Sequence, residues 1–147
     1  LGDVYKRQTG TILIEAGLVG GYTLGIDSSR QMIRGCELNL RRYGIRGYSL
    51  LLADSLKMPL KARFDHLVTD PPYGRSSPSS VDVERIYESF PEVASQVIKP
   101  GGTLCMASPS TLEISERIEA CGFKLEGFAY QRVHGSLGRH LYLARNC

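Results

Sequence analysis

Four consecutive residues, Asp70, Pro71, Pro72 and Tyr73, have the types and order needed to act on an amino group attached to an aromatic ring. Such an amine is a poor nucleophile because its lone pair is delocalised into the ring, so a catalyst must hold both of its hydrogens. The Asp70 carboxylate can accept one hydrogen and the Pro71 carbonyl the other, on a backbone that two prolines make rigid. Tyr73 can stack on the flat ring. We interpret the tetrapeptide as a candidate catalytic site rather than a plain proline-rich turn.

Aspartates also end the two preceding apolar runs of the sequence, at Asp27 and Asp54. Ligands of a parallel sheet bind beyond the carboxyl ends of its strands, so these carboxylates and Asp70 are expected to converge on one crevice. Asp27 can accept both hydroxyls of a ribose, and Asp54 can accept an adenine amine. A single aspartate in such a place is commonly a helix cap, but three in the same relative place favour a ligand site. Ser28 and Ser55, which follow the first two aspartates, complete this group of candidate cofactor residues.

Two further segments are weaker candidates. Thr9, Gly10 and Thr11 open the first predicted helix, where backbone N–H groups and a glycine without a Cβ suit a cofactor loop. His134 and Arg139 lie beside a predicted turn near the end of the chain and could contact RNA, although a lone histidine in a turn is more often simply exposed.

The pattern of apolar residues predicts strands alternating with helices. Strands are expected at residues 22–26, 48–53, 64–69, 103–107, 123–133 and 140–144, and helices at 11–19, between Ser28 and Gly44, at 81–98 and at 111–121. Pro91 is expected to break the third helix, and residues 99–102 are expected to form a turn. Such alternation predicts a parallel sheet covered on both faces, and the short connection between the last two strands predicts antiparallel pairing. The expected fold is α/β, a doubly wound Rossmann-like sheet with a C-terminal antiparallel hairpin.

Length and composition fit one ordinary globular domain. The chain has 147 residues, 42% hydrophobic and 22% charged, with a net charge of +3. No apolar run approaches the roughly 18 residues of a membrane span, and no signal peptide opens the chain, so we expect a cytoplasmic protein. The four cysteines have no zinc-ligand spacing, so we expect buried, reduced thiols and no metal.

Residues 1–8 resemble the in-frame translation of a transposase adapter used in sequencing libraries. We therefore exclude them from fold reasoning and expect the natural domain to occupy residues 9–147. The segment lacks the apolar run of a central parallel strand, so we expect it to pack poorly.

The tetrapeptide resembles the motif of amino-group methyltransferases that act on adenine N6, guanine N2 or glutamine. The longer run from Thr69 to Ser77 resembles the archaeal tRNA guanine-N2 methyltransferases that modify position 10, and residues 132–139 are similar to the closing hairpin of that family. The resemblance implies a class I methyltransferase domain, S-adenosylmethionine as cofactor and tRNA as partner, and it adds Gly74 and Arg75 to the candidate RNA contacts. In that family a first strand and an RNA-binding domain precede residue 9, so we expect the first strand to be missing here.

The resemblance predicts methyl transfer to the N2 amine of guanine in RNA, with tRNA favoured over ribosomal RNA. The tetrapeptide alone equally permits methylation of adenine N6 in DNA or RNA, and Gly74, Arg75 and the hairpin favour guanine. Protein-glutamine methyltransferases usually begin the motif with Asn, so Asp70 disfavours them. The hypothesis of a dehydrogenase does not explain why this tetrapeptide follows a strand. An alternative of another class is a truncated, catalytically inactive cofactor domain.

Overall fold

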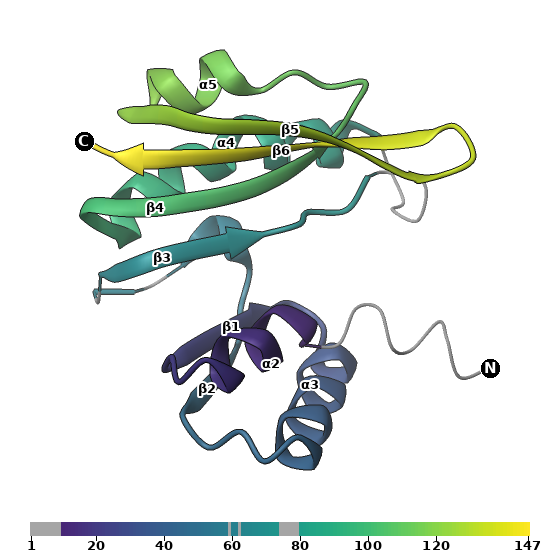
Figure 1. Ribbon diagram of the computed structural model, residues 1–147, viewed down its shortest axis with the longest axis vertical. Helices are drawn as coiled ribbons and strands as arrows, with labels where there is room; N and C mark the ends of the chain where they lie inside the picture. Colours follow the sequence, from purple (N-terminus) through teal and green to yellow (C-terminus); the bar gives the residue numbers. More distant parts are fainter. Residues whose placement is uncertain (1–9, 59, 62, 74–79) are drawn as a thin grey trace. The chain divides into compact units, whose positions relative to one another are not determined.

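The computed structural model describes residues 10–58, 60–61, 63–73 and 80–147. The chain divides into two compact units, Leu1–Met58 and Pro59–Cys147, which are described separately below (Figure 1). Residues 1–8 and Thr9 lie outside the described residues, so the adapter interpretation and the expectation that the first segment packs poorly stay predictions.

In its described residues, the first unit contains two parallel strands, two α-helices and one short 3-10 helix. Its elements in chain order are α2 (Thr11–Leu18), β1 (Thr23–Asp27), α3 (Arg30–Arg42), β2 (Tyr48–Leu52) and the short 3-10 helix η1 (Ser55–Lys57). Strands β1 and β2 pair in parallel, with Thr23 beside Tyr48 and Asp27 beside Leu52. This confirms the predicted alternation of helix and strand in this part of the chain.

The core of the first unit forms where α2 and α3 meet. Its buried residues are Ile14, Cys36, Leu40 and Ile45. Cys36 and Leu40 form the buried face of α3, whereas the side chain of Tyr43 at the end of this helix is 59% exposed. Tyr43 is the C-cap residue, where the backbone leaves the helix and carries the side chain off the buried face.

Glycines end both helices of the first unit as the sequence predicts. Gly20 has φ +88° after α2, and Gly44 has φ +70° after α3. Both angles lie in the left-handed region that side chains with a Cβ rarely adopt, so the helices stop there. Helix α3 is capped by Ser29, one residue after the predicted bound at Ser28, because the Ser29 hydroxyl accepts the N–H of Met32 at 3.3 Å.

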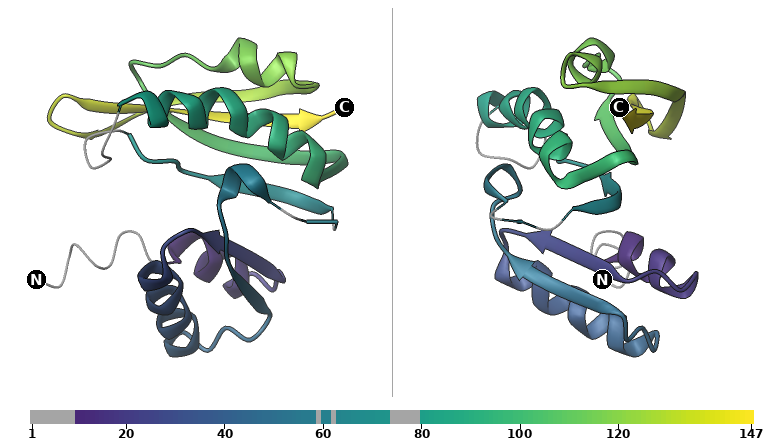
Figure 2. Two further views of the ribbon diagram at one scale, coloured as in Figure 1. Left: turned by 180° about the vertical axis from the view of Figure 1, so that it is seen from behind. Right: turned by 90° about the vertical axis from the view of Figure 1, so that its left-hand side faces the viewer.

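The part of the second unit that the structure describes is a four-stranded sheet with two helices. Its elements are β3 (Phe64–Thr69), α4 (Ser80–Val97), β4 (Ile98–Pro109), α5 (Ser115–Ala120), β5 (Phe123–His134) and β6 (Leu137–Asn146). The strand order is β3-β4-β6-β5, β3 and β4 are parallel, and β6 runs antiparallel to both neighbours. The predicted C-terminal hairpin with a reversed strand near one edge is therefore confirmed (Figure 2).

Helices α4 and α5 cover one face of this sheet. Leu104 and Met106 of β4 pair with Ala144 and Tyr142 of β6, and all four side chains are at most 1% exposed. The helices also contact each other, because the Arg117 Nε on α5 donates to a backbone carbonyl of α4 at 2.6 Å. The site described below begins where β3 leaves this packed sheet.

Three predictions in the second unit are wrong. Pro91 does not break the helix: α4 is continuous, and Pro91 lies inside it fully buried. A proline removes one backbone hydrogen bond, and the burial of Tyr87 and Phe90 on the same helix offsets that loss. Residues 99–102 do not form a separate turn but lie within β4. They interrupt its pairing with β3, because Phe64 pairs with Ile98 and the next pair is His66 with Thr103. The last helix is only Ser115–Ala120, not 111–121.

The cysteines partly match their prediction. All four are unpaired, but only Cys36 is buried, while Cys105 and Cys121 are half-buried and Cys147 is exposed. None of the helices in the described part of the chain is long and apolar enough to cross a membrane.

Candidate active site

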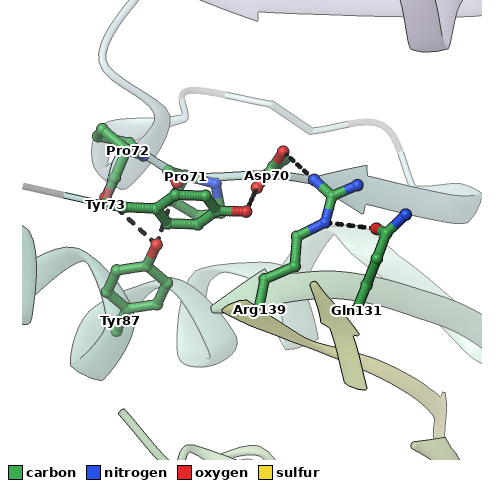
Figure 3. Close-up of polar contacts among 7 residues, drawn as sticks. All are labelled: Asp70, Pro71, Pro72, Tyr73, Tyr87, Gln131 and Arg139. Atoms are coloured by element: carbon green, nitrogen blue, oxygen red, sulfur yellow. Dashed lines mark hydrogen bonds and ion pairs between the residues drawn. The ribbon is translucent and has the colours of Figure 1, made fainter. Parts of the chain in front are cut away.

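The tetrapeptide Asp70 to Tyr73 directly follows β3, at the carboxyl end of that strand (Figure 3). Pro71 is buried, Tyr73 is half-buried, and Asp70 and Pro72 are exposed. The motif therefore has one face against the packed sheet and another open to a ligand. This is the position in which a parallel sheet binds its ligands.

The Asp70 carboxylate has a partner on each oxygen. The Tyr73 hydroxyl donates to Oδ1, and Arg139 Nη1 on β6 donates to Oδ2 at 2.8 Å. Arg139 in turn donates from Nε to Gln131 Oε1 on β5 at 2.8 Å. Figure 3 shows the guanidinium between the carboxylate and the Gln131 amide. The sequence indicated Arg139 only as a possible RNA contact and gave no sign of Gln131.

The backbone carbonyls of the motif are held by a buried tyrosine. The Tyr87 hydroxyl on α4 lies 3.0 Å from the Pro71 oxygen and 3.2 Å from the Pro72 oxygen, so its one hydrogen is shared between them. Tyr87 is 1% exposed, and desolvation raises the pKa of its hydroxyl far above the ordinary value. The hydroxyl therefore stays protonated, orients both carbonyls, and leaves the Pro71 oxygen a second lone pair for a substrate.

Sequence reasoning missed Tyr87 because a buried aromatic residue on a helix looks like ordinary core. Its hydroxyl matters only because α4 places it beside the motif. Burial also raises the pKa of Tyr73, and the hydrogen bond to Asp70 raises it further, so this phenol too stays a donor near neutral pH.

In the first unit, the strand-end aspartates bind the turns that follow them. Asp27 Oδ1 accepts the N–H of Ser29 at 2.7 Å, and Asp54 Oδ1 accepts the N–H of Leu56 at 2.9 Å. Each carboxylate has about four lone-pair sites, so this capping leaves room for ligand hydroxyls or amines. Both aspartates thus have a structural use that is compatible with cofactor binding.

Gly10 is required by a close approach within the protein. It has φ +85°, and a Cβ at this position would lie 2.5 Å from the Cys36 Sγ. Glycine is therefore explained by the packing of α3 against the start of α2, and a role in ligand binding stays a prediction. Thr11, the first residue of α2, is exposed.

Comparison with known proteins identifies the family of this chain. Residues 9–140 match the family described as the RMKL-like methyltransferase domain. The chain belongs to the RMKL-like methyltransferase family. The resemblance inferred from the tetrapeptide and the hairpin is confirmed.

Two archaeal relatives carry the same name, tRNA (guanine(10)-N2)-dimethyltransferase. The one from Pyrococcus abyssi is 39% identical over 139 residues, which cover 92% of this chain and 41% of the relative. The one from Methanothermobacter thermautotrophicus is 36% identical over 132 residues, which cover 89% of this chain and 39% of the relative. The chain spans about two fifths of the length of these relatives.

The fold is also that of solved methyltransferases. The crystal structure of TrmN from Thermus thermophilus matches with a TM-score of 0.78 at 18% identity, covering 95% of this chain and 42% of that chain. The methyltransferase domain thus has the predicted Rossmann-like α/β fold.

The structure describes only some of the other predicted site residues of this methyltransferase domain. Gly74 and Arg75 lie outside the described residues, and His134 is exposed at the end of β5. Asp27 and Asp54 belong to the first unit and Asp70 to the second, so their convergence on one crevice stays a prediction. Within the described residues, no group of three or more histidine, cysteine, aspartate or glutamate side chains could hold a metal ion.

Proposed function

We propose that this protein transfers a methyl group from S-adenosylmethionine to the exocyclic N2 amine of guanine in tRNA. The observation that carries the proposal is the pairing of an Asp70 carboxylate with an oriented Pro71 carbonyl at the end of β3. Two acceptors beside each other suit an amine with two hydrogens. The names of the relatives at 36–39% identity support guanine N2 and tRNA over the other amines.

The side chains act on the amine rather than on the methyl donor. Asp70 accepts one N–H and the Pro71 carbonyl accepts the other, which draws the nitrogen from planar towards tetrahedral geometry and frees its lone pair. The Asp70 charge also offsets the positive charge that develops on nitrogen. Tyr73 stacks on the base, and Tyr87 keeps the Pro71 oxygen fixed during the reaction.

S-adenosylmethionine, when bound, supplies a methyl group attached to a positively charged sulfur. The residues present fit this group, because Asp27 and Asp54 each keep acceptor sites beyond the one used for capping. We assign Asp27 to the ribose hydroxyls and Asp54 to the adenine amine. The remaining candidate cofactor residues are Thr9, Gly10, Thr11, Ser28, Ser55 and Asp70.

The tRNA is expected to contact residues close to the motif and the hairpin. Gly74 and Arg75 follow the motif directly in the sequence, and His134 ends β5 in an exposed position. A basic side chain at either place suits the phosphate backbone.

The full-length protein, incubated with a tRNA transcript and S-adenosylmethionine, tests the proposal. Mass spectrometry of the digested nucleosides should show N2-methylguanosine or its dimethylated form. A transcript with adenosine in place of guanosine 10 is the matched control and should stay unmethylated. Formation of N6-methyladenosine with unmodified guanosine would instead favour adenine methylation. Failure to bind the cofactor in a calorimetric titration would favour the inactive-domain alternative.

A further inference from the structure

The orientation of the Asp70 carboxylate is fixed by one residue close in sequence, Tyr73, and one distant in sequence, Arg139. A free carboxylate rotates readily about its last torsion, because that torsion has a broad energy profile. Here Arg139, 69 residues away, bonds Oδ2 while Tyr73 bonds Oδ1. The carboxylate is thus held at both oxygens without a substrate.

Arg139 is itself held by a second acceptor. Gln131 and Arg139 are directly opposite each other on β5 and β6, and the Arg139 Nε donates to the Gln131 side chain. Because guanidinium is planar, two acceptors on different nitrogens define the plane in which Nη1 meets Asp70. The hairpin therefore presents a donor of fixed direction to the motif (Figure 3).

Fold stability does not account for this arrangement. Among the ion pairs in the described part of the chain, Arg139 is the least exposed cation, at 27%, but Asp70 is still 40% exposed. Ion pairs with this degree of exposure add little to stability. Arg139 nevertheless bonds Asp70, which carries the carboxylate of the catalytic motif.

We propose that Arg139, oriented by Gln131, is a positioning residue that holds Asp70 through Oδ2 so that Oδ1 faces the substrate amine. The Tyr73 hydroxyl occupies Oδ1 until the base arrives, and an N–H of the amine then replaces it. This inference rests on the proposed function and adds to it the residues that set the geometry of the acceptor.

Two effects of Arg139 oppose each other. Its positive charge weakens the electrostatic help that Asp70 gives to the developing positive charge on nitrogen. Its hydrogen bond fixes the acceptor in the productive direction, and misplaced catalytic groups lower rates by about a hundredfold. We expect orientation to dominate, so removal of Arg139 should slow methyl transfer.

The test measures single-turnover methylation by the full-length protein at saturating tRNA and cofactor. Arg139→Ala should lower the rate constant by about tenfold to a hundredfold. Arg139→Lys should recover part of the loss, because an ammonium can reach Asp70 but lacks the fixed plane of guanidinium. Gln131→Ala changes an exposed residue and should give a smaller loss in the same direction.

Arg132→Ala is the matched control. Arg132 lies on the same hairpin, and its guanidinium bonds only the Gly135 carbonyl among the contacts described. It carries the same charge, so a loss of rate that comes only from a weaker general attraction of tRNA should appear in both alanine variants. Only Arg139→Ala should lose rate at saturation, and added methylguanidine should restore part of that rate.

Tyr73→Phe tests the role assigned to the hydroxyl. Its single-turnover rate should stay within about threefold of wild type, because stacking needs only the ring. A loss of more than about tenfold, or an Arg139→Ala rate equal to or above that of wild type, would overturn the inference. A wild-type protein that forms no methylated guanine would remove the proposed function, and this inference with it.

Discussion

The strand-end aspartates of the two units are held in different ways. In the first unit, Asp27 and Asp54 accept backbone N–H groups two residues ahead, so each carboxylate is fixed by its own turn. In the second unit, Asp70 is held by side chains, one of them from β6. The first kind of contact depends on local sequence alone. The second depends in part on β6, which lies across β4 from β3 in the sheet and brings Arg139 to the Asp70 carboxylate.

This difference also separates the roles we assign to them. A carboxylate fixed by its own turn is suited to binding, since its position does not depend on the rest of the fold. A carboxylate fixed by several elements can be oriented finely, which matters more for chemistry than for affinity. The predictions below test this division between binding in the first unit and chemistry in the second.

The largest effect is expected at Asp70. Asp70→Ala should lower the single-turnover rate of the full-length protein by about a hundredfold or more while cofactor and tRNA affinity stay near wild type, because its contribution grows in the transition state. Asp70→Asn keeps an acceptor oxygen, so its single-turnover rate should lie between those of wild type and Asp70→Ala. Near-normal turnover of Asp70→Ala would contradict an amino-methyltransferase mechanism.

Asp27 should show the opposite pattern. Asp27→Ala should weaken cofactor binding by about tenfold to a hundredfold, because two ribose hydroxyls lose charge-assisted hydrogen bonds worth roughly 1.5 to 3 kcal/mol. Isothermal titration calorimetry measures this directly. Asp27→Asn, which can still cap the N–H of Ser29, is the control for the turn. Unchanged affinity in the alanine variant would remove Asp27 from the cofactor site.

Tyr87→Phe should have a moderate effect on both rate and stability. It removes the donor shared by the Pro71 and Pro72 carbonyls and should cost about 1 kcal/mol in the free energy of unfolding and about three- to tenfold in rate.

Tyr142→Phe is the matched control for Tyr87→Phe. Tyr142 is equally buried, and its hydroxyl donates to Glu113 and accepts the Ile114 N–H instead of contacting the carbonyls of the motif. Urea denaturation should show a similar loss for both variants, and single-turnover assays should show a slower rate for Tyr87→Phe alone. Equal rates in the two variants would argue against a positioning role for Tyr87.

The smallest effect is expected at Asp54. Asp54→Ala loses the cap of the exposed η1 turn and should destabilise the protein by about 0.5 to 1 kcal/mol. Asp54→Asn retains that cap and should match wild type in urea denaturation. If Asp54 accepts the adenine amine, the alanine variant should also bind the cofactor about threefold more weakly. An unchanged cofactor affinity would leave Asp54 with its capping role alone.

The sequence by itself determined the features that depend on neighbouring residues. The sequence of residues 64–69 predicted β3 with its observed bounds, and the glycines that end α2 and α3 lie where left-handed backbone is needed. The tetrapeptide also indicated its chemistry, because its acceptors and its aromatic ring are adjacent in the chain. The predicted helix break at Pro91 was wrong because packing of α4 on the sheet outweighed the local preference of proline.

Only the tertiary structure decided what surrounds the motif. Tyr87 looks like a core aromatic residue and Arg139 like a surface cation until α4 and β6 bring them to the carbonyls and carboxylate of residues 70–72. The physical reason is that these hydrogen bonds join atoms 15 to 69 residues apart, and no local pattern of hydrophobicity or turn chemistry encodes such a pairing. The sequence therefore determined which residues could do chemistry, and the fold determined how they are held.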